Sequence, residues 1–289
     1  MNVKFSNEEV LKVVKLIRKI SRNLVFTIFE IGALPAEDQP EPFHQILDFF
    51  PNSRIYAFEV DAEVCKILNK ETLKKITFYP VALGKTKEKR IFYETNHPMC
   101  GSLYKPNEEL IKLYNTMDEA LLKSTSIIET DSIDHFCKNN MIQDIDFIKI
   151  DVQGAELDVF KGCITNLPNI VATVCEVEFI QQYIDQPLFG DVCSFLANNN
   201  LMFHKFLTIG GRSLKPVTFQ DNRNFPTQHM WSDAIFIRNI LNLSELSADK
   251  LLKLGLISFI YGSPDVTYQC IKLYDIKQNT RYLNDLTKL

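Results

Sequence analysis

The sequence predicts a doubly wound α/β fold, in which helices cover both faces of a mostly parallel sheet. Short apolar runs rich in β-branched residues alternate with amphipathic segments of helical spacing, which is typical of such folds. Gly32, Glu59 and Asp151 each follow one of these runs. The carboxyl ends of parallel strands lie at one edge of the sheet, where ligands bind in open α/β folds. We therefore expect a ligand site at that edge.

Composition and charge narrow the classes of function. The chain has 289 residues, 46% of them hydrophobic, which supplies a sizeable core. Its formal charge of −4 gives no basic surface, so we expect no nucleic-acid partner. No apolar run approaches the ~18 residues that a membrane span needs, and the N-terminus lacks a signal-peptide pattern. The seven cysteines are scattered without a Cys-x-x-Cys pair, which predicts reduced thiols, no zinc site and a cytoplasmic location.

The chain is expected to divide into three parts. These are an N-terminal helix, a central α/β domain and a C-terminal helical extension, at residues 1–23, 24–240 and 241–289. Ser6 and Glu9 form a capping box at the start of the first helix, which runs to Ile20. The extension is predicted to contain two amphipathic helices, over residues 246–261 and 265–276. We expect this extension to mediate a homodimer or to pack beside the substrate cleft.

The first predicted strand, residues 24–31, ends in Glu30 and Ile31 and is followed by Gly32. A glycine here lets the backbone turn sharply and approach a ligand closely. A dinucleotide-binding turn would carry further glycines around a pyrophosphate, whereas the acidic segment 34–42 follows here. Its acids would repel a pyrophosphate and tolerate the positive sulfonium of S-adenosylmethionine. The alternative is that they belong to a solvated helix start.

The second and third strands are predicted over residues 54–58 and 76–83. Glu59 and Val60 follow the second strand. A carboxylate at this point accepts hydrogen bonds from a ribose diol in such sheets. The alternative for Glu59 is a strand end that faces solvent.

Residues 145–151 are predicted to form a buried central strand that ends at Asp151, and Gly154 then starts a helix. A carboxylate at this edge is costly to desolvate unless a cation or a hydrogen-bond donor meets it. We therefore favour a ligand-binding role for Asp151 over a simple helix cap. The fifth strand, 170–177, ends in Glu176-Val177-Glu178, and the alternation of side chains places both glutamates on one side.

Residues 95–124 are the least sheet-like part, and we place the substrate site there, which under a transfer reaction is the acceptor site. The loop at 96–105 mixes hydrogen-bonding side chains with turn residues, which is typical of a lid over a sheet edge. We expect His97, Ser102 and Tyr104 to contact the acceptor. The alternative is an ordinary surface insertion.

The remaining elements complete an alternating pattern. Helices are predicted over residues 43–50, 62–69, 132–139 and 191–197, with Asp131 as an N-cap and a further helix start at Asn107. Short strands are predicted over 89–93, 126–129, 201–209 and 234–238. Gly210-Gly211-Arg212 is interpreted as a loop between the last two strands.

A nine-residue segment identifies a family. Ile148-Lys149-Ile150-Asp151-Val152-Gln153-Gly154-Ala155-Glu156 resembles the signature of the FkbM-type S-adenosylmethionine-dependent methyltransferases, which usually carry Glu where this chain has Gln153. The resemblance extends from about Leu24 to Arg238 and includes Tyr56–Glu59, Pro80–Gly84 and Gly101–Leu103. The single glycine at Gly32 departs from the family's common Gly-Ala-Asn-x-Gly turn.

The resemblance implies a Rossmann-like class I methyltransferase fold, a seven-stranded mostly parallel sheet with one antiparallel strand. It implies S-adenosylmethionine as the cofactor, with its adenine ring beside Val81 and Ala82. It also implies O-methylation of a hydroxyl group on a sugar, a polyketide or a similar small metabolite. The last two strands would then form an antiparallel hairpin.

These expectations give a set of site residues. Those assigned to the cofactor are Glu30, Gly32, Glu59, Val60, Val81, Ala82 and Asp151. A hydroxyl acceptor is a poor nucleophile near neutral pH and needs a base within ~3 Å, so Asp151, Glu178 and His229 are the catalytic candidates. Asp151 with Glu176 or Glu178 offers oxygen ligands for a divalent ion, but no metal is assigned.

Two other functions stay open on sequence alone. The same fold hosts nicotinamide-dependent oxidoreductases, although the acidic, glycine-poor first turn disfavours that cofactor. A binding or scaffold protein that kept the fold and lost activity is the non-enzymatic alternative. The altered turn at Gly32 and the helical extension are the features that support it.

Overall fold

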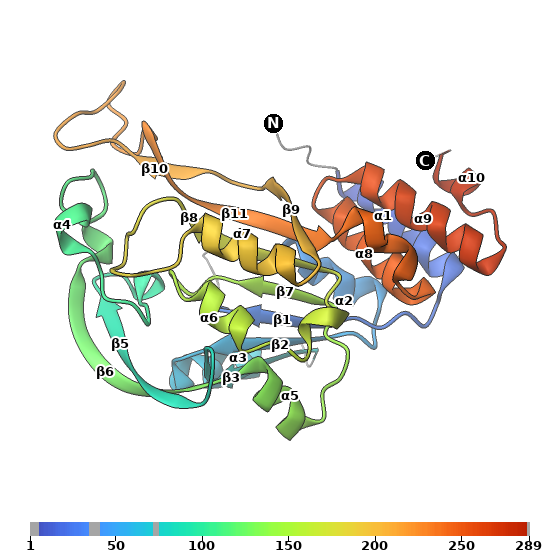
Figure 1. The fold of residues 1–289 in the computed structure, drawn as a ribbon, viewed down its shortest axis with the longest axis horizontal. Helices are drawn as coiled ribbons and strands as arrows, with labels where there is room; N and C mark the ends of the chain where they lie inside the picture. Colours follow the sequence, from blue (N-terminus) through green and yellow to red (C-terminus); the bar gives the residue numbers. More distant parts are fainter. Residues whose placement is uncertain (1–5, 35–40, 72–74, 288–289) are drawn as a thin grey trace.

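The computed structural model describes residues 6–34, 41–71 and 75–287. Its centre is an eight-stranded sheet in the order β10-β11-β8-β7-β1-β2-β3, with β9 also paired to β11 (Figure 1). The strands are β1 (Thr27–Ile31), β2 (Arg54–Glu59), β3 (Ile76–Pro80), β7 (Phe147–Ile150), β8 (Ala172–Glu178), β9 (Leu201–Phe206), β10 (Gly210–Arg212) and β11 (Gln228–Arg238).

The pairing of these strands confirms the predicted fold class. Neighbours along β3-β2-β1-β7-β8 are parallel, and β11 is antiparallel to both β8 and β9. The eighth strand, β10, is a three-residue addition that pairs with β11. The prediction of a loop at Gly210–Arg212 was therefore wrong, whereas the antiparallel pairing of the last two long strands was right.

A second, three-stranded sheet lies beside the first. Its order is β4-β6-β5, with β4 at Ala82–Leu83, β5 at Glu88–Thr95 and β6 at Leu122–Asp131. The predicted third strand is thus split at Val81, and β4 belongs to this second sheet. Both β5 and β6 are longer than predicted. Antiparallel strands with one solvated face carry polar residues, which interrupt the apolar pattern from which strand length was predicted.

Helices form most of the connections. The α-helices are α1 (Asn7–Ile20), α2 (Ile46–Phe49), α3 (Ala62–Glu71), α4 (Glu108–Ile111), α5 (Ile133–Asn140), α6 (Glu156–Lys161), α7 (Phe189–Asn198), α8 (Ala248–Ile260), α9 (Pro264–Gln278) and α10 (Leu283–Leu286). The 3₁₀ helices are η1 (Pro42–Gln45), η2 (Pro98–Cys100), η3 (Asp118–Ala120), η4 (Leu167–Asn169) and η5 (Ile240–Glu245).

Local capping explains where several helices begin. The Ser6–Glu9 capping box is present at α1, as predicted. At α5 the N-cap is Ser132, whose hydroxyl accepts from the His135 amide, so the assignment of Asp131 as the cap was wrong. Asp131 instead accepts from the Ser132 amide and is hydrogen-bonded to the His135 ring.

Two hydrophobic clusters cover the two faces of the main sheet. Alternate residues of each strand enter opposite clusters: Phe147 packs with α1, α2, α8 and α9, whereas Ile148 and Ile150 pack with α5, α6 and α7. Figure 1 shows the first group of helices gathered at one end of the molecule, away from β5 and β6. By the same alternation, Lys149 lies on the side of the first cluster.

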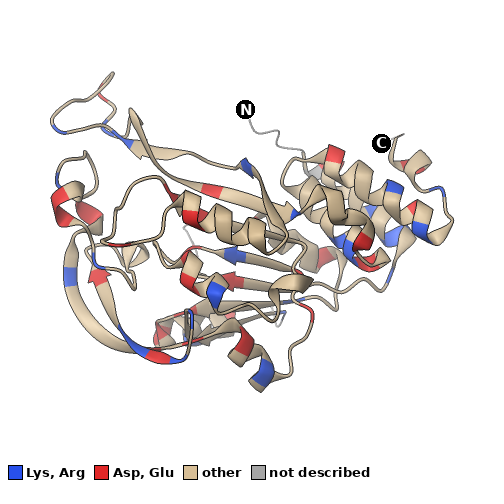
Figure 2. Cartoon of the chain, in the orientation of Figure 1, with Lys and Arg blue, Asp and Glu red and all other residues tan. Residues whose placement is uncertain are grey.

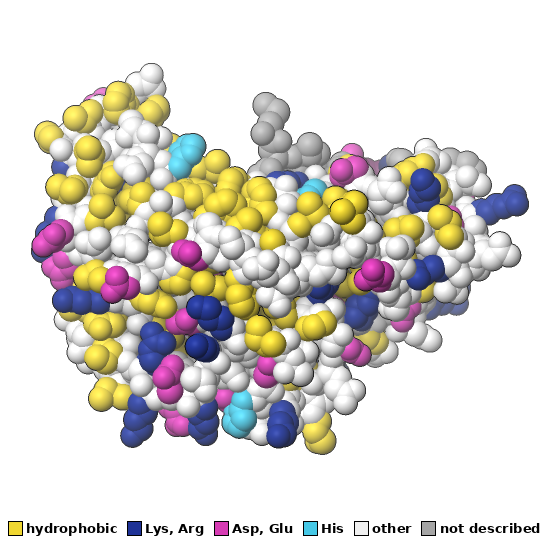
Figure 3. Space-filling view, in the orientation of Figure 1, with side chains coloured by type: hydrophobic (Ala, Val, Ile, Leu, Met, Phe, Trp, Pro, Cys, Tyr) yellow, Lys and Arg dark blue, Asp and Glu magenta, His cyan; other side chains and the backbone are white. Residues whose placement is uncertain are grey.

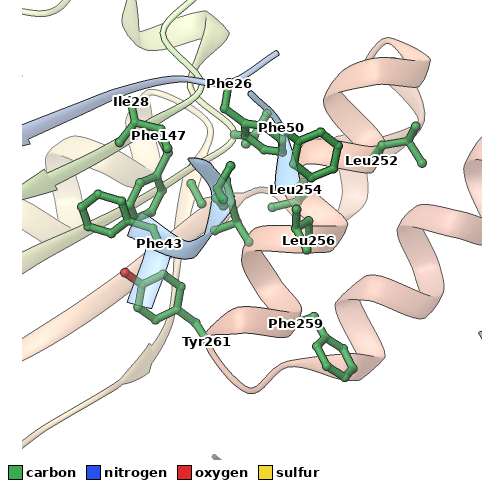
Figure 4. Packing of buried hydrophobic residues seen from close by; sticks show 14 of the residues in the cluster. Phe26, Ile28, Phe43, Phe50, Phe147, Leu252, Leu254, Leu256, Phe259 and Tyr261 are labelled. Carbon is green, nitrogen blue, oxygen red and sulfur yellow. The ribbon is translucent and has the colours of Figure 1, made fainter. Parts of the chain in front are cut away.

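The C-terminal extension shares its core with the sheet. Leu252, Leu254 and Leu256 of α8 are fully buried in the same cluster as Ile28 and Phe147 (Figure 4). Tyr261 lies against the Phe147 ring, with ring centroids 5.9 Å apart. The extension therefore forms part of the cover of the sheet. Its role in a homodimer stays a prediction.

A buried ion cluster joins the extension to the sheet. The Asp146 carboxylate, fully buried just before β7, lies 2.6 Å from Lys250 Nζ and 2.8 Å from Lys253 Nζ, both on α8. It also accepts a hydrogen bond from the Thr27 amide of β1. One carboxylate therefore connects β1, β7 and α8.

Charges of both signs are interspersed over the rest of the chain (Figure 2). No helix within the described residues has both the length and the hydrophobicity to cross a lipid bilayer. Figure 3 shows hydrophobic side chains gathered along one side of the molecule, over the β9–β11 hairpin.

Candidate functional site

A cavity of about 850 Å³ opens at the carboxyl edge of the main sheet. It is bounded by the ends of β1, β2 and β7, by the second sheet and by the loop 98–103. All residues that the sequence assigned to the cofactor line it: Glu30, Gly32, Glu59, Val60, Val81, Ala82 and Asp151. The structure thus places these residues around one space.

Gly32 allows the ends of β1 and β7 to approach each other closely. Its φ is +75°, and a Cβ on Gly32 would lie 1.8 Å from the Asp151 carbonyl oxygen. The Gly32 and Ala33 amides both donate to the Phe58 carbonyl oxygen of β2, at 3.0 Å each. Any residue other than glycine would bring a side chain into this contact. Gly32 therefore sets the spacing between the ends of β1, β2 and β7.

Glu59 is turned toward its own loop. Its Oε1 accepts from the Val60 amide at 2.8 Å and from the Asp61 amide at 3.3 Å. Burial raises the pKa of Glu59, and these two amides only partly counter that effect. The carboxyl group is therefore positioned by backbone donors in the cavity lining.

Asp151 forms an ion pair with Lys149 of the preceding strand. The Lys149 Nζ lies 2.9 Å from Asp151 Oδ2 and 4.0 Å from Asp233 Oδ1. Burial alone would raise the pKa of Asp151, but the Lys149 ammonium and the Gln153 amide outweigh it and lower that pKa. Burial would likewise lower the pKa of Lys149, but Asp151, Asp233 and Glu41 raise it. Both partners are therefore charged.

Gln153 connects two carboxylates of the cavity. Its Nε2 donates to Asp151 Oδ1 at 2.8 Å and to Glu176 Oε2 at 2.7 Å. Its Oε1 accepts from the Tyr183 hydroxyl at 3.2 Å. The residue has a φ of +54°, which costs a non-glycine residue free energy and signals a functional constraint. A neutral amide at this position supplies a donor that a glutamate would lack.

The match to known families decides the identity of the domain. The sequence model described as "Methyltransferase FkbM domain" matches residues 30–203, which is more than half of the chain. The chain belongs to the FkbM methyltransferase family. The resemblance inferred from the signature segment is therefore confirmed.

Three solved structures resemble this FkbM methyltransferase at a TM-score of 0.35 each. They are the fibrillarin pre-rRNA processing protein of Methanococcus jannaschii (10% identity; 75% of this chain and 68% of that chain covered), a fibrillarin/Nop5p complex (11%; 80% and 82%) and the 23S rRNA methyltransferase ErmE (9%; 95% and 100%). Likeness at this level bears on neither the site nor the acceptor. No curated protein matches the chain.

The three predicted acceptor residues hold the loop together, and none of them lines the cavity of this FkbM methyltransferase. His97 caps η2 through its Nδ1, which accepts from the Met99 amide. Ser102 is buried and donates to the Gln153 carbonyl oxygen at 2.6 Å. The Tyr104 hydroxyl donates to Asp158. The loop itself does reach the cavity, because neighbouring residues line it: Pro98, Met99, Cys100, Gly101 and Leu103.

Two of the three catalytic candidates lie outside the cavity lining. Glu178 is 2% exposed, and its carboxylate is buried beside those of Glu156 and Glu176. His229 is exposed and pairs with Gly211 of β10. Asp151 is in the lining, as is Glu176, which the alternation of β8 had placed on the same side as Glu178.

Sequence reasoning missed several polar residues of the lining. His44 Nε2 lies 2.8 Å from Glu30 Oε2, and Glu41 lines the same end. Lys149 could have been found, because a lysine within a buried apolar strand requires a partner. Arg212 and Trp231 gave no sequence signal, since β10 and β11 bring them to the cavity from a segment interpreted as a loop. The acidic turn at residues 35–40 lies outside the described residues.

The carboxyl groups of three glutamates lie close together at the signature segment, which contributes one of them. Carboxylate oxygens of Glu156, Glu176 and Glu178 all lie within 4.8 Å of one another. Burial, together with the neighbouring carboxylates, raises the pKa of Glu156 to about 7 and the pKa values of Glu176 and Glu178 well above the usual range. Glu156 Oε1 accepts from the Val152 and Gly154 amides, which shapes the turn after β7.

The stability of the folded chain is expected to fall as pH rises from 4.5 to about 7, the window between the ordinary and the folded pKa of Glu156. Within this window the folded state keeps a proton that the unfolded state releases, so higher pH favours unfolding. The loss is on the order of 3 kcal/mol for a shift of this size. Urea unfolding at several pH values measures it.

Glu156→Gln is the matched variant for this measurement. Glutamine keeps the oxygen that accepts the two amides and mimics the protonated acid, so the variant should gain stability relative to the wild type as pH rises. Equal pH slopes for the two proteins would contradict the assigned ionisation.

Proposed function

We propose that the protein transfers a methyl group from S-adenosylmethionine to a hydroxyl group of a small acceptor, such as a sugar. The observation that carries the proposal is the single cavity around Gly32, Glu59 and Asp151 in a chain of the FkbM methyltransferase family. This family membership favours methyl transfer over a nicotinamide-dependent reaction. That the acceptor is a small molecule and not a nucleic acid stays a prediction.

The charge of the cavity supports a cationic cofactor. Carboxylates dominate this part of the lining: Glu30, Glu41, Glu59, Asp61 and Asp151. Lys149 and His44 oppose them but are already paired with Asp151 and Glu30. The sulfonium and ammonium groups of S-adenosylmethionine would offset the remaining negative charge, whereas a pyrophosphate would add to it.

Individual residues have distinct roles in this proposal. The second oxygen of Glu59 accepts from the ribose hydroxyls, since Oε1 is engaged by the Val60 and Asp61 amides. Val81 and Ala82 border the adenine ring at the junction of the two sheets. Asp151 holds a fixed negative charge at the methionine end, because Lys149 and Gln153 keep it ionised.

Glu176 is the base that the geometry favours. It lines the cavity, Gln153 donates to its Oε2, and it also has a side-chain hydrogen bond with Asp151, so its carboxyl group is held at the cavity, where it can take the proton of the acceptor hydroxyl. Burial and the neighbouring carboxylates raise the pKa of Glu176, so its ionised form is a stronger base than an ordinary glutamate but is formed only at higher pH, and methyl transfer should therefore become faster as pH rises. When bound, S-adenosylmethionine supplies an electrophilic methyl group and leaves as S-adenosylhomocysteine. Alignment of acceptor and methyl group in the cavity provides most of the acceleration.

Calorimetry with S-adenosylhomocysteine tests the cofactor assignment. The purified protein should bind it with a dissociation constant in the micromolar range. Absence of binding up to millimolar concentration would end the proposal. Binding without any methyl transfer to cell extracts would instead support the non-enzymatic binding protein.

Glu176→Gln is expected to slow methyl transfer by about 10²- to 10⁴-fold, because it removes the base. Transfer of a trideuteromethyl group from labelled cofactor to extract components, followed by mass spectrometry, measures the rate. The affinity for S-adenosylhomocysteine should change little. Glu178→Gln is the control, since it removes a neighbouring carboxylate outside the cavity lining. A larger loss in the Glu178 variant would reassign the base.

A further inference from the structure

Arg212 and Trp231 form a distinct part of the cavity lining, opposite in charge to the cofactor end. The Arg212 guanidinium carbon lies 4.8 Å from the centre of the Trp231 ring, which is the geometry of a cation–π contact. Both side chains line the cavity. They come from β10 and from β11, outside the matched methyltransferase segment.

Two glycines build this arrangement. A Cβ on Gly210 would lie 2.1 Å from Cε2 of Trp231, so the indole can lie over β10 only because residue 210 has no side chain. A Cβ on Gly211 would lie 2.1 Å from the Gln228 carbonyl oxygen of β11. The backbone of β10 thus approaches β11 closely enough to present Arg212 next to the ring. The indole face in turn restricts the guanidinium, which lowers the entropy lost when it binds a ligand.

The Arg212 guanidinium has N–H groups that do not donate to any group of the described residues. Its Nη1 donates to the Gly211 carbonyl oxygen, whereas Nε is buried and has no hydrogen-bond partner among the described residues. No carboxylate of the described part of the chain forms an ion pair with Arg212. Glu119 lines the same cavity and favours the charged form of Arg212, although burial lowers its pKa. A partly buried cation without a paired anion is costly unless a ligand completes it.

Arg212 also lies on the acceptor side of the cavity. Cys100, on the loop over the sheet edge, is close enough to Glu176 and Arg212 for both to act on its pKa, which burial raises to about 11. The Tyr183 hydroxyl, which donates to Gln153, also donates to the Cys100 carbonyl oxygen. The base and the guanidinium therefore border one region of the cavity, near Cys100.

We propose that Arg212, held on Trp231, determines acceptor specificity by binding an anionic group, a carboxylate or a phosphate, of the acceptor. The proposal rests on the proposed function and names the substrate class of that site. Planar donors of a guanidinium match both anions in a bidentate geometry. The carboxylates at the other end of the cavity repel an anion, and Lys123, a second cation of the lining, is exposed to solvent on β6, so an anion binds best at the half-buried Arg212, which orients the acceptor hydroxyl toward Glu176.

Matched pairs of small molecules test the proposal on the full chain saturated with S-adenosylhomocysteine. The pairs are 4-hydroxybenzoate with 4-hydroxybenzamide, and glucose 6-phosphate with glucose, so the two anions are separate arms. Calorimetry or ligand-detected NMR should show that at least one charged compound binds about tenfold to a hundredfold more tightly than its neutral partner. Arg212→Gln should abolish this preference, and Arg212→Lys should keep part of it. Arg223→Gln, on an exposed loop, should change nothing.

Equal binding of the charged and neutral compounds, or no binding of either anion at millimolar concentration, would overturn the proposal. Retention of the preference by Arg212→Gln would overturn it as well. Binding of S-adenosylhomocysteine by each variant serves as the fold control. It also separates the two claims, because a protein that binds S-adenosylhomocysteine but shows no anion preference keeps the proposed function and loses only this inference.

Discussion

Asp146→Ala should destabilise the protein by about 3–5 kcal/mol, because it leaves two lysines of α8 without the carboxylate that neutralises them. The side chains of Lys250 and Lys253 are only 15% and 11% exposed, so water cannot replace the lost partner fully. The substitution also leaves the Thr27 amide of β1 without its acceptor. Urea unfolding monitored by circular dichroism measures the change in free energy.

Two further variants separate the contributions. Asp146→Asn keeps an oxygen for the Thr27 amide and removes only the charge, so it should account for most of the loss. Glu245→Ala removes an exposed carboxylate near the start of α8 and should cost less than about 0.5 kcal/mol. If Asp146→Ala cost no more than this control, the ion cluster would not hold the extension to the sheet.

Gly32→Ala should destabilise the fold by about 3 kcal/mol or more and reduce methyl transfer about a hundredfold. The added Cβ would meet the Asp151 carbonyl oxygen at 1.8 Å, in a backbone conformation that alanine rarely adopts. Either β1 or β7 must then move, and with it the Asp151 carboxylate, which we propose to lie at the methionine end of the cofactor. Unfolding free energy and affinity for S-adenosylhomocysteine are the two measurements.

Gly190→Ala is the matched control for this variant. Gly190 lies in α7, where an added Cβ would meet no atom within 4 Å. Alanine should therefore be neutral or slightly stabilising there. Retention of wild-type stability and binding by Gly32→Ala would show that the three strand ends tolerate a wider spacing than the structure has.

The strand ends were predictable from sequence because each depends on local signals. Gly32, Glu59 and Asp151 each follow an apolar run, and parallel strands bring such residues to one edge regardless of the connections between them. The site residues that depend only on this rule all line the cavity. Helix starts marked by a capping box were likewise visible in the sequence.

The rest of the site depends on contacts distant in sequence. Glycines disfavour strands, so β10 was interpreted as a loop, and its pairing with β11 follows only from the packing of Trp231 over Gly210. Alternation placed Glu176 and Glu178 on one side but could not show that Glu176 lines the cavity and Glu178 does not. Ser102 and Tyr104 looked like acceptor contacts, yet both are used to fix the loop.

The order of the strands has a practical consequence for fragments of this protein. The segment matched by the family model ends at residue 203, within β9, whereas β11 lies between β8 and β9 in the sheet. A truncated chain that stops where the similarity stops would leave β8 as an open edge, with unpaired backbone groups that invite aggregation. Useful truncation points must therefore follow the sheet and extend beyond residue 238, where β11 ends.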